Sequence, residues 1–308
     1  MKILLYYLLL SVAFFFVACS DDDDANLTPT GETNWFVLED SEDEVDNLAY
    51  MIFKDTRIPI YYNDTIARIP VGQSATGEEV FRYETLGVNY SITGYTAYKY
   101  ELLSDRVAIK EGMEWLRDRV MPKLLNGMVP KSFFLTAKFE NAFGSKPFAV
   151  ETYKALRTTC IYWDKGKEDE LAAAVLAVEY AAYMLEREEE LEELDEFYME
   201  SEGVINGKTV LLYGQSLTKS NGSRGDSWDT NVETFGFLSW DKTATKSTTT
   251  WKAPSKSQDL ADYVKVVLLG DDEGFKAQYA KYKKCLQKYD MMKQIVAELQ
   301  TTLGKLQK

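Results

Sequence analysis

Apolar residues recur every three to four positions in several segments of the chain, a spacing that predicts helices. The first segment follows Ser41, which we expect to be an N-cap because acidic residues fill the turn after it. In the second segment, Ile109, Met113, Leu116 and Val120 share one face. We therefore expect helices over residues 41–53, 106–125 and 175–185, and a helical C-terminal part from residue 259 to the end.

Between these helices, runs rich in aromatic and β-branched residues predict strands. Pro59 lies in the first run, Ile58–Tyr62, and indicates a strand at a sheet edge. The pair Asn206-Gly207 is typical of a hairpin turn leading into a strand. Because helices and strands do not alternate regularly, the expected fold class is α+β, a mixed sheet packed on helices. Further strands are expected over residues 80–103, 131–139 and 156–164 and within 203–254.

The composition excludes some functions. The net charge is −14, and no basic stripe is present to neutralise phosphates, so we expect no binding to nucleic acid. The chain has no histidine, which removes the commonest metal ligand and the commonest general base together. Apolar residues make up 45 % of the 308 residues, which is ample for a core. Any catalysis would have to proceed without imidazole.

The first residues, MKILLYYLLLSVAFFFVACS, are typical of an export signal. Lys2 supplies the positive start, a long apolar run follows, and small residues mark a cleavage site before Cys19. A transmembrane helix is the alternative, although the run is short for one. Phe16-Val17-Ala18-Cys19 resembles a bacterial lipobox, with Phe16 where leucine is usual. The resemblance implies that Cys19 is lipidated and anchors the mature protein to a membrane.

An acidic run, Asp21–Asp24, follows the lipobox directly. It resembles the surface-export signal of Bacteroidetes lipoproteins, and it also suits a solvated tether. We therefore expect a signal peptide over residues 1–18, a polar tether over 19–38 and a folded domain over 39–308. The expected location is the outer membrane, with the domain lipid-anchored and exposed at the cell surface.

Two further cysteines remain. Cys160 lies in a strand-like run and Cys285 on a late helix. An oxidising compartment would permit a bridge between them. We expect instead two free, buried cysteines.

The segment VLAVEYAAYML, residues 175–185, carries a single charge, Glu179, in an otherwise apolar helix. A buried helix normally excludes a carboxylate unless a partner pairs with it. The run EREEELEELDEFY that follows can extend this helix as a solvated one, with Leu191, Leu194 and Tyr198 as its packing stripe.

A zinc metallopeptidase helix carries H-E-x-x-H, in which two histidines one turn apart bind zinc and the glutamate activates water. Aligned on its glutamate, this chain has Val178 and Ala182 at the two ligand positions. Neither side chain can bind a metal.

Segments around this helix resemble, in order, those of the substrate-import-associated zinc metallohydrolase lipoproteins of Bacteroidetes, a zinc-binding metallopeptidase family. Residues 177–184 resemble the family's H-H-E-F-A-H-I-L pattern, and Gly236–Ser239 matches its G-F-[VL]-S segment. Residues 258–262 loosely resemble its acidic helix start, which supplies a further ligand, with Gln258 replacing an acid. The resemblance covers residues 40–300 and implies a zincin-like fold.

The departures imply a pseudoenzyme, which is a metallopeptidase scaffold without zinc chemistry. Glu179 is then either a remnant of the general base or a glutamate on an exposed edge of the helix. Asp259 and Asp262 are residual carboxylates of the lost site, and carboxylates alone make a weak zinc site. We therefore expect no metal and no cofactor.

Three tryptophans, Trp228, Trp240 and Trp251, lie in the polar segment beside the expected cleft. Exposed aromatic side chains could stack on a sugar or peptide, whereas ordinary packing is the alternative.

Three functions fit the sequence. The first is a non-catalytic binding or accessory component of nutrient import, which would act beside an outer-membrane importer on a peptide or glycan ligand. The second is an active metal-dependent hydrolase or peptidase that uses an unconventional carboxylate site around Glu179, Asp259 and Asp262. The third is a structural lipoprotein. Metal analysis of the purified protein separates the first two.

Overall fold

A computed structural model describes residues 34–89, 98–142, 148–218, 231–241 and 250–305. Contacts separate a short unit, Met1–Asn34, from a main unit, Trp35–Lys308, and the fold described below is that of the main unit. The expected signal peptide and Cys19 lie outside the described residues. None of the described helices is long and apolar enough to cross a membrane.

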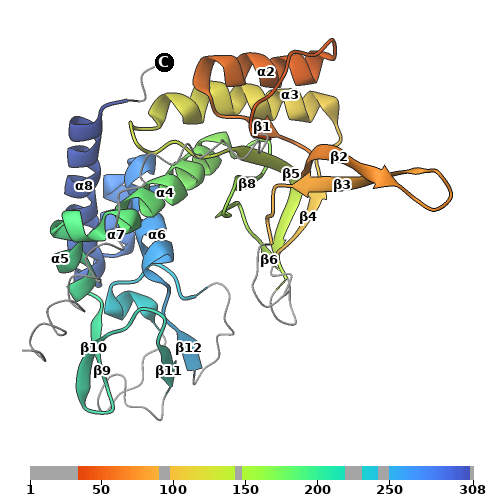
Figure 1. Cartoon of the computed structure of the whole chain (residues 1–308). Coiled ribbons are helices and arrows are strands. Elements are labelled where there is room, and N and C mark those ends of the chain that lie inside the picture. Colours follow the sequence, from red (N-terminus) through yellow and green to blue (C-terminus); the bar gives the residue numbers. More distant parts are fainter. Residues whose placement is uncertain (1–33, 90–97, 143–147, 219–230, 242–249, 306–308) are drawn as a thin grey trace, which may run out of the picture. The chain divides into compact units, whose positions relative to one another are not determined.

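The main unit has the expected α+β character, with helices and strands in irregular order (Figure 1). The helices are α2 (Glu44–Thr56), α3 (Arg106–Trp115), α4 (Glu168–Glu186), α5 (Glu193–Met199), α6 (Lys256–Leu269), α7 (Asp272–Gln278) and α8 (Lys283–Leu303). The strands are β1 (Ile60–Tyr61), β2 (Thr65–Gln73), β3 (Glu79–Thr85), β4 (Tyr98–Leu102), β5 (Phe133–Asn141), β6 (Phe148–Ala149), β7 (Thr152–Lys154), β8 (Thr159–Tyr162), β9 (Glu202–Ile205), β10 (Lys208–Leu211), β11 (Ser216–Thr218) and β12 (Thr250–Lys252).

The main sheet has six strands and is built around β5. β1 and β8 pair with β5 in parallel, β7 pairs with β8 in antiparallel, and β4 and β6 pair with the C-terminal half of β5 in antiparallel. The sheet is therefore mixed, as expected. The strand order begins with β1, which confirms the edge position predicted from Pro59.

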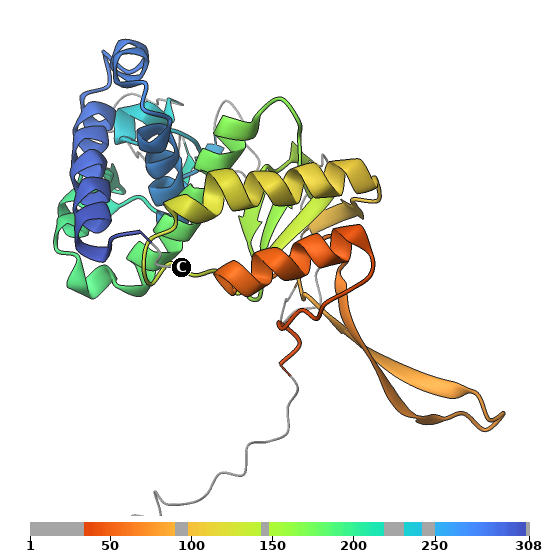
Figure 2. The same cartoon turned by 90° about the horizontal axis from the view of Figure 1, so that it is seen from above.

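The two faces of this sheet support separate clusters. Phe133 and Leu135 of β5 pack with α2, α3 and the first half of α4. Phe134 of β5 and Cys160 of β8 belong to a cluster on the other face. Helices α2 and α3 run side by side along the first face, as the view from above shows (Figure 2). The four residues predicted to share one face of the second helix are all buried: Ile109, Met113, Leu116 and Val120.

Helix α4 belongs to two cores. Leu171 and Val175 lie in the core between the sheet and α2 and α3. Tyr180 and Met184, farther along the same helix, lie in a second core formed with α5, α6, α7 and α8. Because both parts of α4 are enclosed, the helix can be apolar almost all round.

Several boundaries differ from the predictions. The helix expected over residues 106–125 is an α-helix only as far as Trp115, and a π-helix, Leu116–Val120, and a 3-10 helix, Met121–Lys123, follow it. Asp43, and not Ser41, caps α2, since its carboxylate accepts from the backbone N–H groups of Val45 and Asp46. The predicted extension of α4 to Tyr198 is wrong, because the helix ends at Glu186 and a separate α5 follows. In one continuous helix, glutamates four residues apart would repel one another and disfavour the helix there, as Glu186 would with Glu190 and Glu188 with Glu192. Leu194 and Tyr198 are nevertheless buried, as the stripe predicted.

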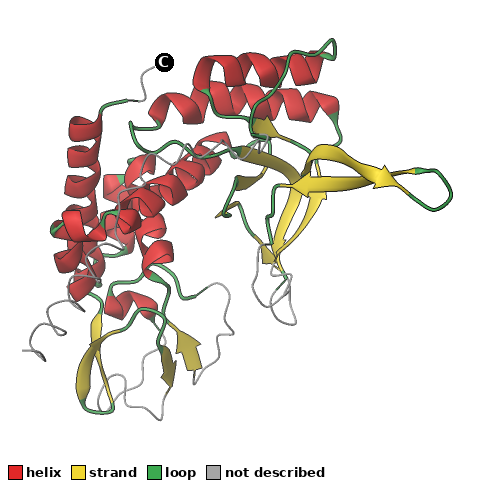
Figure 3. Cartoon of the chain, in the orientation of Figure 1, coloured by secondary structure: helices red, strands yellow, loops and turns green. Residues whose placement is uncertain are grey.

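The predicted hairpin is confirmed. β9 and β10 pair in antiparallel with Ile205 opposite Lys208, and Asn206 and Gly207 form the turn with φ of 51° and 77°. Positive φ at both central residues is the type I′ requirement that Asn-Gly meets. With the β11–β12 pair, this hairpin surrounds a small third core. The long β2–β3 ribbon carries no core of its own and extends away from the helices (Figure 3).

Candidate functional site

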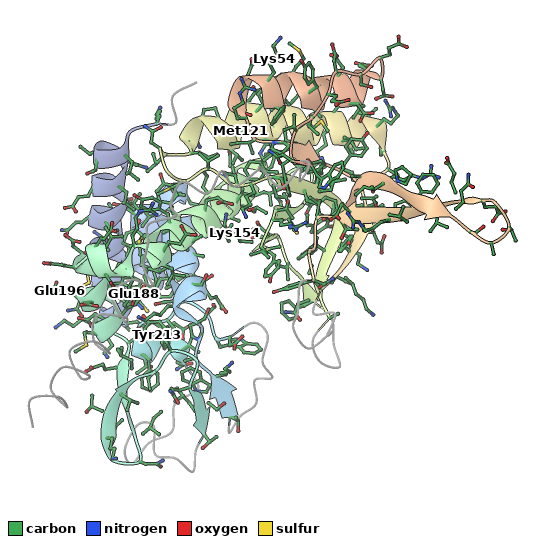
Figure 4. The ribbon with its side chains drawn as sticks, in the orientation of Figure 1. Lys54, Met121, Lys154, Glu188, Glu196 and Tyr213 are labelled. Carbon is green, nitrogen blue, oxygen red and sulfur yellow. The ribbon has the colours of Figure 1, made fainter. Side chains whose placement is uncertain are left out.

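Glu179 lies at the contact between α4 and the edge of the main sheet. Its side chain is only 3 % exposed, so the alternative of an exposed-edge glutamate is wrong. Lys154 Nζ donates to Oε2, and Thr159 Oγ1 donates to Oε1 at 2.5 Å. Figure 4 shows Lys154 beside the middle of α4. The carboxylate is thus paired on both oxygens, which is the condition for burying it.

Strand pairing brings the two donors together. Lys154 on β7 and Thr159 on β8 are direct cross-strand partners in the antiparallel register. Cross-strand partners project on the same face of a sheet, so one carboxylate can bind both. Glu179 therefore fastens α4 to the β7–β8 edge. A general base needs a free oxygen for a water molecule, and here both oxygens already accept hydrogen bonds.

Val178 and Ala182 lie one helical turn apart on α4, and both are partly exposed while their neighbours Ala177 and Ala181 are buried. They therefore mark the one side of this helical segment that reaches the surface. Their side chains offer no donor atom to a metal. The residues present do not fit a zinc ion at this position.

Asp259, predicted as a residual metal carboxylate, lies instead in a buried ion pair. Lys288 Nζ on α8 lies 2.5 Å from Asp259 Oδ2, and both side chains have zero exposure. Tyr213 Oη donates to the same oxygen at 2.7 Å, and Ser201 Oγ accepts from Lys288 Nζ at 2.8 Å. Asp259 Oδ1 has no hydrogen-bond partner among the described residues. This pair joins α6 to α8 within the core.

Aromatic rings enclose the Lys288 ammonium. Its Nζ lies 4.1 Å from the ring centroid of Phe197 and 5.0 Å from that of Tyr263. Phe237 and Tyr213 contribute two further rings, at 5.1 Å and 5.6 Å. Burial lowers the pKa of Lys288 and raises the pKa of Asp259, while their mutual attraction opposes both shifts. The ring faces offset part of the desolvation cost of the cation.

Asp262 is also engaged, since Ser239 Oγ donates to its Oδ2. Gln258 Nε2 donates to Ser239 Oγ at 2.7 Å and to the backbone oxygen of Trp240 at 2.9 Å. Tyr263 Oη donates to the backbone oxygen of Gly236 at 2.9 Å. The structure therefore brings together the two downstream segments that the sequence singled out, residues 236–239 and 258–262. It does not bring Glu179, Asp259 and Asp262 into one group, and the described residues contain no cluster of three acids or thiols able to hold a metal.

The tryptophans differ in position. Trp251 has zero exposure and lies in the third core, so its prediction as a ligand contact is wrong. Its ring packs against that of Phe235, with the two ring centroids 5.7 Å apart. Trp240 is partly exposed and packs against the same core. Trp228 lies outside the described residues.

Both cysteines within the main unit are free and buried, as predicted. Burial raises the pKa of Cys285 to about 11 and raises that of Cys160 further. Since the thiolate is the reactive form, neither thiol is a nucleophile at neutral pH.

Sequence reasoning missed Lys154, Thr159, Lys288 and Tyr213, which are the partners of the buried acids. Lys288 carried a signal, because it falls at helical spacing among Cys285, Tyr289 and Met292, all of which are buried. No feature of the sequence marked Lys154 or Thr159 as a partner of a buried acid. Comparison of the chain with protein families, with curated proteins and with solved structures finds no match.

Proposed function

We propose that this chain is a surface-exposed, lipid-anchored protein of zincin-like fold that binds a ligand without catalysis, as an accessory component of nutrient import. One observation carries the proposal: the carboxylate at the position of a metallopeptidase base is bound by Lys154 and Thr159. At the two ligand positions beside it stand Val178 and Ala182.

The arrangement supports binding more than chemistry. The partly exposed side of α4 carries Val178 and Ala182, and α4 also contacts β7, the short strand that ends the main sheet. A peptide or glycan ligand on this side of α4 would meet small apolar side chains.

Metal analysis tests the non-catalytic part. The purified chain should contain no stoichiometric zinc and should cleave no peptide in a chelator-sensitive way. One tightly held zinc per chain would overturn the proposal, since the described residues contain no cluster that could hold it.

Fractionation tests the anchor. The parent chain should fractionate with membranes, and Cys19→Ala should release it, with the matched variant Cys160→Ala as a control that keeps the lipid. If Cys19→Ala remains with the membrane fraction, the lipid anchor is wrong.

A further inference from the structure

Strands β2 and β3 form a two-stranded ribbon that joins no larger sheet within the described residues. Most of its side chains are exposed, including Val71 at 55 %, Val80 at 42 % and Tyr83 at 57 %. Figure 1 shows the ribbon reaching beyond β4 and β5. A two-stranded ribbon is marginally stable by itself in water, and added strands would stabilise it.

The two edges of the ribbon differ. Pro70 interrupts β2, and two register shifts, at Thr65/Ala67 and at Pro70/Gly72, each place an extra residue on β2. Proline lacks the N–H that a further strand needs, and bulges turn an edge away from pairing. β3, with the sequence EVFRYET, has neither proline nor glycine and carries no extra residue. The edge of β3 is therefore the one suited to pairing with another strand.

We propose that β3 pairs in antiparallel with β3 of a second copy of this chain, centred on Tyr83. Within one chain Arg82 lies 3.6 Å from Glu84, which also lies 3.9 Å from Arg157. In the proposed register Arg82 also lies opposite Glu84 of the partner subunit, and the symmetry repeats that pair. Tyr83 lies opposite its own copy. A register centred on Arg82 would instead set two arginines opposite each other, which is destabilising.

The ribbon also places one cation on the strand beside Tyr83. Arg68 on β2 is the cross-strand partner of Tyr83, and its guanidinium lies 3.5 Å from the ring centroid of Phe81. Pairing through β3 would form a four-stranded sheet. Across it, Arg68 and Tyr83 of one chain would lie in line with Tyr83 and Arg68 of the partner subunit. Two short strands bury less than a stable interface needs, so the dimer would have a dissociation constant on the order of micromolar.

Charge reversal tests both the pairing and its register. Arg82→Glu alone sets like charges opposite each other, and Glu84→Arg alone does the same. Each variant should dimerise about tenfold more weakly than the parent in sedimentation equilibrium. An equimolar mixture should recover dimer, because every acid of one chain then faces an arginine of the other. Lys123→Glu and Glu298→Arg, both exposed and distant from β3 in sequence, serve as matched controls.

A cysteine at the symmetry centre gives an independent measurement. Directly opposed residues of an antiparallel pair have Cα atoms about 4.5–5.5 Å apart, within the range of a disulfide. In a Cys19→Ser background, Tyr83→Cys should therefore form an intermolecular disulfide rapidly, and Glu79→Cys on the same strand should not. A parent chain that stays monomeric, a mixture that fails to recover dimer, or equal cross-linking at both positions would each overturn the proposal. Melting temperatures confirm that the variants are folded.

Discussion

Replacing Lys288 by methionine should cost more stability than replacing any of the exposed lysines of the chain. Methionine fills a similar space, but it removes the ammonium that binds Asp259 Oδ2. Asp259 then stays buried, and only the Tyr213 hydroxyl still donates to that oxygen. Breaking a buried ion pair from one side costs about 3–5 kcal/mol. For a unit of this size, that corresponds to a fall in melting temperature of about 10 °C.

The loss should depend on pH. Without Lys288, burial raises the folded-state pKa of Asp259 above its ordinary value of 3.8 with no cation to oppose the shift. The folded state then binds the proton more readily than the unfolded state does. The free energy of unfolding of Lys288→Met is therefore highest below the unfolded-state pKa of Asp259, and it falls as pH rises through the folded-state pKa of this residue. Relative to the parent, Lys288→Met should be weaker at about pH 8 than at about pH 5.

Urea unfolding at both pH values measures the effect. Lys283→Met, at the exposed start of the same helix, is the matched control and should stay within about 0.5 kcal/mol of the parent. The double variant Lys288→Met/Asp259→Asn carries neither buried charge and should lose the pH dependence. The reasoning is refuted if Lys288→Met matches Lys283→Met, or if its deficit is the same at both pH values.

Three further variants test other parts of the molecule. Glu179→Gln removes the charge that binds α4 to the sheet edge and should cost about 1–3 kcal/mol in urea unfolding, whereas no loss would contradict a structural role for this carboxylate. Val178→His/Ala182→His places two imidazoles one turn apart, so zinc should raise its melting temperature by the equivalent of about 2.7 kcal/mol at a hundredfold excess over the dissociation constant, and an unchanged value would show that no site forms. Gly207→Ala forces a Cβ into positive φ and should destabilise by about 1 kcal/mol in the same urea assay, with loss in the β9–β10 hairpin visible by hydrogen exchange.

Local chemistry made parts of this fold predictable from the sequence. The face of Ile109 and Met113 follows from helical spacing, and the hairpin at Asn206-Gly207 follows from the φ values that its turn requires. Each of these two signals comes from residues that lie within a few positions of one another in the sequence. The π-helix at Leu116–Val120 could not be predicted from such signals, and the helix expected over residues 106–125 therefore ran too far.

Partners that are distant in the sequence could not be predicted. Glu179 was recognisable as a charge that needed an explanation, yet its donors lie 20 and 25 residues earlier. They meet it only because β7 and β8 pair in one particular register. The partner of Asp259 lies 29 residues later, on a helix whose packing on α6 the sequence does not specify. Register and helix packing together decide what these acids do.

The sharing of α4 between two cores limits how this protein can be divided or altered. A fragment that ends before α4 lacks Leu171 and Val175 from the core on the sheet, and one that begins after α4 lacks Tyr180 and Met184 from the helical core. The main unit should therefore unfold in a single cooperative transition. Insertions and deletions should be tolerated where neither core is touched, at the tips of the β2–β3 ribbon and the β9–β10 hairpin, and these are the places where related chains would be free to diverge in length.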